Sequence, residues 1–314
     1  MWNKIEVVSQ FTSAVCNNQP VCIDLLSEGP AFENLDIFDS LIRICKEHNY
    51  NLDNITVTSC NTYQQSVDQI NFETVFPNHF VFNTVKKLEN KPINKDITKT
   101  FGIFVGRSNC HRLDLSSYLF NKYRQQTNQT FHYDYSDDYH KNNLGLDTLV
   151  EIQGTGDLAS ISNFLRHCPI RLQETVEYPI LMNQHCNMYS QYRNFFVEIV
   201  CETSYVGNTF FPTEKIWRPI IMQTPFIVQG SQHFLHRLQK LGFKTFNQWW
   251  DEGYAEDPAD WQPGEIKKVI DRLAKKPADE IKKIYNEMLP TLEHNRQLLL
   301  DMNKDFIASI PCTN

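Results

Sequence analysis

The chain has 314 residues, with 37 acidic and 30 basic side chains and a formal charge of −7 at pH 7. A chain of this length can bury one large apolar core or two ordinary ones. Its hydrophobic fraction of 41% excludes a chain that stays disordered for lack of apolar side chains. The acidic balance disfavours duplex DNA as the main partner, because DNA-binding proteins usually present a basic face.

Neither a membrane span nor a disulfide framework is expected. No apolar run approaches the length that spans a bilayer, and the first residues lack the basic segment and apolar core of a signal peptide. The nine cysteines are scattered without CxxC spacing, which favours reduced thiols and gives no zinc pattern. These features predict a cytoplasmic protein.

The first ninety residues alternate between short apolar runs and amphipathic segments. Residues 21–26 and 55–58 are predicted to be strands, with an amphipathic helix at residues 38–48 between them. Residues 79–85 form another apolar run, and we expect them to be a third strand. This alternation indicates βαβ units and a mostly parallel sheet.

A polar stretch at residues 88–99, with one proline and no apolar periodicity, follows this region. We place a domain boundary there, which gives an N-terminal domain of residues 1–95 and a C-terminal domain of residues 96–314. Strands are expected in the second domain at residues 101–105, 130–135, 196–201 and 224–228. Helices are expected at residues 113–123, 157–167, 234–241, 264–275 and 278–306, with a loop or broken helix at 248–262.

The common nucleotide-binding motifs are absent, since the chain contains neither Gly-x-Gly-x-x-Gly nor a Walker sequence. Several polar residues nevertheless follow predicted strands directly: Glu28, Asn61, Arg107 and Glu202. In parallel α/β sheets, ligands bind beyond the carboxyl ends of the strands. We therefore treat these four positions as candidates for one site.

The most informative segment is residues 195–230, which reads as strand, loop, helix and strand. Thr213 is predicted to cap the helix, so Glu214 and Lys215 fall in its first turn, and Pro219 is expected to kink it. A helix N-terminus suits a phosphate, and a lysine there adds a positive charge. A glutamate can accept hydrogen bonds from a ribose diol. The alternative is an ordinary charged first turn.

This segment carries a family resemblance. Glu202-Thr203, Thr213-Glu214-Lys215, Pro225-Phe226-Ile227-Val228 and Gly230 together resemble the donor-binding core of fucosyltransferase-like glycosyltransferases of the GT-B fold. Residues 241–246 and 251–254 resemble the tails of phage and giant-virus members of such groups. The resemblance implies two Rossmann-like domains facing across a cleft, with closing C-terminal helices. For a viral protein, the location would be the host cytoplasm.

The resemblance also assigns roles to individual residues. An arginine in the turn after the first strand of the second domain contacts the donor pyrophosphate, which implies Arg107, with Arg112 as second choice. A surface pair between an arginine and Asp114 is the alternative. Glu202 and Thr203 are expected to contact the donor or to cap the loop, and Tyr205 to stack on a nucleobase. Phe210 is the less favoured stacking residue, because core packing is its more common fate.

The catalytic base is expected in the N-terminal domain, where Glu28 follows the first strand, ahead of Asp24 inside it. Trp249, Trp250 and Tyr254 either line an acceptor groove or pin the C-terminal helices. The acidic run Asp134 to Asp138 is interpreted as a solvated loop. No metal ligands are predicted.

These observations predict a metal-independent, inverting glycosyltransferase that moves a sugar from a nucleotide-diphosphate sugar to a glycan or another hydroxyl acceptor. The resemblance slightly favours a GDP-sugar over a UDP-sugar, and no further cofactor is expected. The alternatives are a DNA-base glycosyltransferase and an inactive sugar-binding or scaffold protein of the same fold. The oligomeric state is left open.

Overall fold

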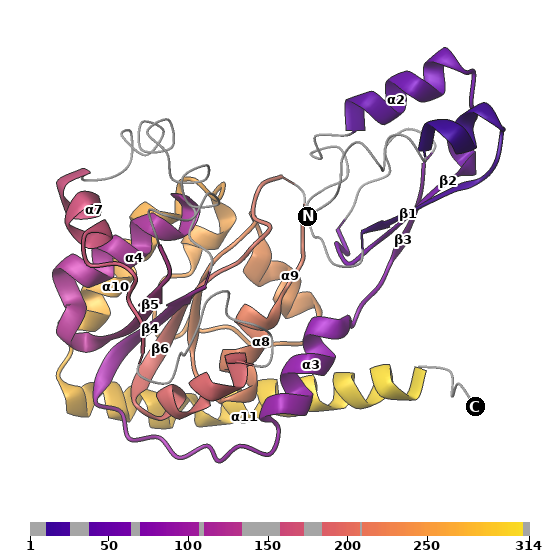
Figure 1. Ribbon diagram of the computed structural model, residues 1–314. Coiled ribbons are helices and arrows are strands. Elements are labelled where there is room, and N and C mark those ends of the chain that lie inside the picture. Colours follow the sequence, from indigo (N-terminus) through magenta and orange to yellow (C-terminus); the bar gives the residue numbers. More distant parts are fainter. Residues whose placement is uncertain are drawn as a thin grey trace.

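The computed structural model describes residues 11–25, 38–63, 70–106, 110–133, 158–172, 184–207 and 209–309. Two parallel β-sheets carry helices packed against them (Figure 1). The expectation of an α/β fold with parallel strands is therefore confirmed.

The smaller sheet contains β1 (Val21–Leu25), β2 (Ile55–Ser59) and β3 (Asn71–Thr74) in the order β1-β2-β3. Burial alternates along β2, as expected for a sheet with one covered face. Helix α2 (Phe38–Glu47) buries Leu41, Ile44 and Cys45 in the apolar cluster of this sheet. This cluster is smaller than the one beneath the second sheet and separate from it.

The larger sheet has the order β5-β4-β6-β7. Its strands are β4 (Lys99–Val105), β5 (Thr127–Phe131), β6 (Phe195–Cys201) and β7 (Phe226–Gln229). Every residue of β5, β6 and β7 is buried. Continuous burial is typical of parallel strands that have helices on both faces.

The helices divide between the two faces of the larger sheet. Helix α4 (Cys110–Tyr123) leads from β4 to β5, and α8 (Glu214–Ile221) leads from β6 to β7, so the two connections run in opposite directions from the central β4–β6 pair. Because such crossovers are right-handed, α4 and α8 cover opposite faces. Helices α7 (Leu158–Leu165) and α10 (Gln262–Ala274) pack with α4, whereas α3 (His79–Leu88) and α11 (Ala278–Ser309) pack with α8 (Figure 1).

The remaining elements are short. They are α9 (Phe234–Lys240) and the 3-10 helices η2 (Leu52–Asn54), η3 (Arg124–Gln126), η4 (Gln184–Arg193) and η5 (Gly253–Glu256). The broken segment expected at residues 248–262 is thus confirmed, and α10 and α11 match the two closing helices expected from the sequence.

The prediction of a strand at residues 79–85 is wrong, because these residues begin helix α3. The Asn78 side chain caps this helix by accepting a hydrogen bond from the backbone N–H of Phe80. The third strand of the sheet is instead β3, a largely exposed edge strand at residues 71–74. Its polar sequence gave no strand signal.

The segment between α3 and β4 contains no helix or strand at residues 91–98. Helix α3, which precedes it, packs on the larger apolar cluster through Val81, Val85 and Leu88. A domain boundary at residue 95 stays a prediction. In the part of the chain that the structure describes, no helix is both long and apolar enough to cross a membrane.

Candidate functional site

Glu202 and Thr213 are joined where β6 ends and α8 begins. The backbone N–H of Thr213 donates to Oε1 of Glu202 over 3.2 Å, and its hydroxyl donates to Oε2 over 2.7 Å. Both residues are buried, and the Thr213 side chain also accepts from the backbone N–H of Lys215, as predicted for the N-cap. The strand end and the helix start are thereby fixed to each other.

Lys215 and Glu214 lie in the first turn of α8, as expected. The Lys215 ammonium is 2.9 Å from Oε1 of Glu214 and donates to the Thr213 hydroxyl over 3.2 Å. The two side chains are 18% and 19% exposed, so they can still meet a ligand. Burial raises the pKa of Glu202, and the charge of Lys215 opposes this shift. One lysine therefore faces two carboxyl groups.

Arg112 approaches the same place from the other side of the sheet. It lies in the first turn of α4, is 5% exposed, and donates from Nη2 to the Thr203 hydroxyl over 3.2 Å. Asp114 pairs with Lys267 of α10 at 2.7 Å, and the alternative pairing of Asp114 with Arg107 stays untested because Arg107 lies outside the described residues.

Tyr205 stacks on His111, which neighbours Arg112 in α4. The ring centroids are 3.6 Å apart and the planes differ by 7°. Burial, together with the nearby charge of Arg112, lowers the pKa of His111 to about 3, so the ring is neutral at pH 7. Sequence reasoning did not select His111. Its position two residues into a helix that follows a strand is the signal that could have identified it.

These residues surround the switch point of the larger sheet. The chain leaves β4 and β6 towards opposite faces, and such a point is where open α/β sheets bind ligands. The N-termini of α4 and α8 both lie at this edge, because each helix starts after a strand of the same direction. The positive dipole ends of these two helices favour an anion.

The carboxyl end of β2 in the smaller sheet reaches the same region. The backbone N–H of Phe210, between β6 and α8, donates to Oδ1 of Asn61 over 2.8 Å. The guanidinium of Arg237 lies 3.6 Å from the ring centroid of Tyr63 and donates to the backbone oxygen of Thr209. Loops from both sheets therefore meet beside the candidate site.

His79 and Phe80, at the start of α3, lie beside the residues that lead into α8. The rings of Phe80 and Phe211 are edge-on, with centroids 5.4 Å apart. Burial lowers the pKa of His79, and the negative charge of Glu214 opposes the shift. An imidazole from the first 95 residues is thus electrostatically coupled to the first turn of α8.

Glu28, Arg107 and the acidic run at residues 134–138 lie outside the described residues. Phe210 is buried and packs on Phe234, so its core packing is confirmed. Trp250 and Tyr254 are also buried. Their burial supports the alternative in which they pin the C-terminal helices, rather than the one in which they line an acceptor groove.

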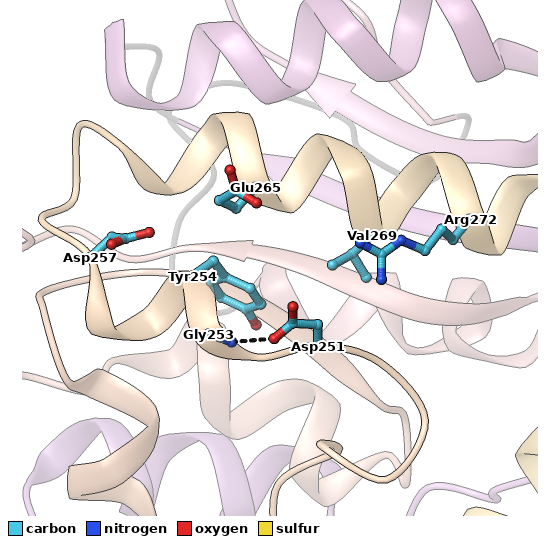
Figure 2. A pocket seen from close by; sticks show the side chains of 7 residues that line it. All are labelled: Asp251, Gly253, Tyr254, Asp257, Glu265, Val269 and Arg272. Carbon is cyan, nitrogen blue, oxygen red and sulfur yellow. Dashed lines mark hydrogen bonds between the residues drawn. The ribbon is translucent and has the colours of Figure 1, made fainter.

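A separate hollow of about 200 Å³ lies between residues 251–257 and α10 (Figure 2). Asp251, Asp257 and Glu265 line it together with Arg272. Asp251 accepts a hydrogen bond from the backbone N–H of Gly253, as Figure 2 shows. No residue of the candidate site lines this hollow. Within the described ranges, no three His, Cys, Asp or Glu side chains are grouped as a metal site requires.

Comparison with protein-family models, with curated proteins and with solved structures finds no match to this chain.

Proposed function

We propose that this chain is a glycosyltransferase of the GT-B type, which transfers a sugar from a nucleotide-diphosphate sugar to a hydroxyl acceptor. The observation that carries the proposal is the first turn of α8, where Lys215 and Glu214 lie beside the buried Glu202–Thr213 pair at the switch point. The family resemblance carried by the same segment agrees with it. A GDP-sugar is the slightly favoured donor.

In this proposal the diphosphate binds between the starts of α8 and α4. Lys215 neutralises part of its charge, and the helix N–H groups contribute the rest together with Arg112 or Arg107. The ammonium of Lys215 is only partly exposed, so solvent screens its charge less than that of a free surface lysine. Glu214 accepts hydrogen bonds from the ribose hydroxyls. These groups stabilise the negative charge that develops on the leaving diphosphate.

The acceptor is proposed to bind on the side of the smaller sheet. Its hydroxyl oxygen attacks the anomeric carbon while the bond from that carbon to the diphosphate oxygen breaks. The nucleoside diphosphate leaves with the bonding electrons, and a base takes the hydroxyl proton. Glu28 is the proposed base. His79 is the alternative, because it lies in the same half of the chain and is coupled to Glu214.

The donor site is tested by thermal-shift screening with GDP, UDP, CMP, dTDP and their sugars, followed by calorimetry on Lys215→Ala. Charge-assisted contacts contribute about 1.5–3 kcal/mol, so we expect a loss of about ten- to a hundred-fold in nucleoside-diphosphate affinity. Nucleoside affinity should change little. Lys282→Ala, on the exposed side of α11, is the matched control. Equal affinity in wild type and Lys215→Ala would contradict the site. Arg107→Ala and Arg112→Ala then show which arginine contacts the diphosphate.

The base is tested by Glu28→Gln in a transfer or donor-hydrolysis assay with binding measured alongside. Turnover should fall by about 10² to 10⁴, which is the usual contribution of general-base catalysis, while donor affinity stays within about two-fold. Glu33→Gln, at an acid five residues further along the sequence with no proposed role, serves as control. Unchanged turnover in Glu28→Gln, with turnover lost in His79→Gln, would assign the base to His79.

A further inference from the structure

The hollow of about 200 Å³ between residues 251–257 and α10 combines charged and apolar surface (Figure 2). Glu265 and Arg272 lie seven residues apart on α10, which places their backbones about 10 Å apart. Val269, between them, is apolar and buried. At about 30 Å³ per water molecule the volume equals about seven waters, which is room for one sugar ring. The charged residues that line the hollow are Asp251, Asp257, Glu265 and Arg272.

The charged groups of the hollow offer both kinds of hydrogen-bonding partner. Carboxylates only accept hydrogen bonds, whereas a guanidinium only donates them. Asp251 accepts from a backbone N–H, and Glu265 pairs with Lys268 on the same helix. Within the described ranges, no hydrogen bond or ion pair engages the carboxylate of Asp257 or the guanidinium of Arg272. Both groups are therefore available to a ligand.

Trp261 lies on the turn that leads from this hollow into α10. Its backbone N–H donates to the oxygen of Pro258 over 2.9 Å, and the Gln262 side chain donates to the backbone oxygen of Asp257 over 3.0 Å. The turn is thereby fastened at one end of the hollow. Trp261 is 74% exposed, more than any other large apolar side chain in the described part of the chain. Tyr254, which also lines the hollow, is buried, so Trp261 is the aromatic residue that a ligand can reach.

The same turn is tied to the carboxyl edge of the larger sheet. Oε1 of Gln262 accepts from the backbone N–H of Gly230, the residue after β7, over 3.1 Å. The oxygen of Gln229, in the same peptide unit, accepts from the backbone N–H of Glu202 in the candidate site over 3.0 Å. The N–H and C=O of a trans peptide point in opposite directions. The turn that carries Trp261 and the candidate site therefore flank the end of β7 on opposite sides.

We propose that the hollow, together with Trp261, binds one sugar unit of a glycan. A sugar hydroxyl both donates and accepts hydrogen bonds, so it matches carboxylates and a guanidinium in one cavity, whereas an ammonium group only donates. The indole suits the apolar face of the sugar ring. Three carboxylates against one arginine in the lining disfavour a sugar that carries a carboxylate or a phosphate. The inference rests on the proposed function and narrows its hydroxyl acceptor to a neutral glycan of more than one sugar.

The test titrates the full chain with the methyl glycosides of glucose, galactose, mannose and N-acetylglucosamine, observed by NMR of the ligand. At least one glycoside should bind to wild type. Trp261→Ala should weaken that binding about three- to ten-fold through loss of the aromatic surface, and Asp257→Asn about ten-fold through loss of a charge-assisted hydrogen bond. Trp261→Phe keeps an aromatic ring and should lose less. Asp260→Asn, exposed on the same turn, and Lys215→Ala are the controls and should leave the glycoside affinity unchanged.

The outcomes separate the sugar subsite from the proposed function. Wild type that binds none of the four glycosides overturns the subsite, and so does equal affinity in wild type and Trp261→Ala. Tighter binding of methylammonium, lost in Asp257→Asn, assigns the hollow to a cation and also overturns it. GDP and UDP are titrated alongside, and glycoside binding without nucleotide binding overturns the proposed function while the sugar subsite stands.

Trp261 is exposed, so Trp261→Ala should keep the thermal unfolding midpoint of wild type. If the midpoint falls, Trp261→Phe and Asp257→Asn decide the outcome, and wild-type affinity in both overturns the subsite.

Discussion

Five polar side chains meet below the candidate site, in the interior around the larger sheet. Glu198 of β6 accepts from the hydroxyl of Tyr192 over 2.7 Å and lies 3.5 Å from Nη2 of Arg218. The ammonium of Lys95 donates to the backbone oxygen of Tyr192 and to the hydroxyl of Thr224, over 2.5 and 2.6 Å. Lys95 belongs to the segment before β4, so this cluster fastens that segment to the sheet.

The cluster predicts a pH dependence of stability. Burial raises the pKa of Glu198 to about 7, and Arg218, Tyr192 and Lys95 oppose the shift while Glu202 adds to it. Between pH 7 and 4.5 the folded protein therefore takes up a proton that the unfolded chain does not, and stability from this group rises as pH falls. In urea titrations, the free energy of unfolding of wild type minus that of Glu198→Gln should increase as the pH falls from 7 to 4.5.

The size of that difference at any one pH is not diagnostic, because Glu198→Gln also removes the partner of Arg218. Glu287→Gln, exposed on α11, controls for the general titration of carboxylates. A difference that stays constant from pH 7 to 4.5 would mean that Glu198 ionises with an ordinary pKa.

At the scale of elements, α3 shows why local patterns fail. Its first seven residues are apolar and aromatic enough to predict a strand. The buried positions Val81, Thr84, Val85 and Leu88 nevertheless follow helical spacing, and Asn78 is a good N-cap. The helix is favoured because α8 and α11 offer it an apolar surface, which depends on tertiary structure. The polar strand β3 is formed for a similar reason, by backbone pairing with β2.

The candidate site was predictable where one local segment determines it. Residues 201–215 carry the strand end, the cap at Thr213 and the Glu214–Lys215 pair, and all three occur as expected. The contact of Arg112 with Thr203 and the stack of Tyr205 on His111 join residues about ninety positions apart. Such pairs follow from the order of the strands in the sheet, which periodicity does not reveal.

At the scale of the whole molecule, the two sheets have separate apolar clusters but are connected at the candidate site. Asn61 is fully buried where it accepts from Phe210, and the Thr62 N–H donates back to the Phe210 oxygen over 3.3 Å. The pairing of Tyr63 with Arg237 adds a cation–π contact. We call these contacts the Asn61–Arg237 contact set. They make the position of the smaller sheet depend on the loop that leads into α8.

The Asn61–Arg237 contact set predicts how the two sheets, each with its own apolar cluster, unfold. In the double variant Asn61→Ala, Arg237→Ala, the buried N–H of Phe210 loses its acceptor, which costs about 1–3 kcal/mol. The smaller sheet should then unfold at a lower urea concentration than the larger one, since it buries less apolar surface. Labelling of the buried thiol of Cys45, followed by mass spectrometry, reports on the smaller cluster, and fluorescence of Trp217 and Trp250 reports on the larger one.

The gap between the two unfolding midpoints should widen relative to wild type, whereas Arg43→Ala, exposed on α2, should leave it unchanged. If the double variant keeps the wild-type gap, the two sheets are held together by other contacts, with α3 the next element to test.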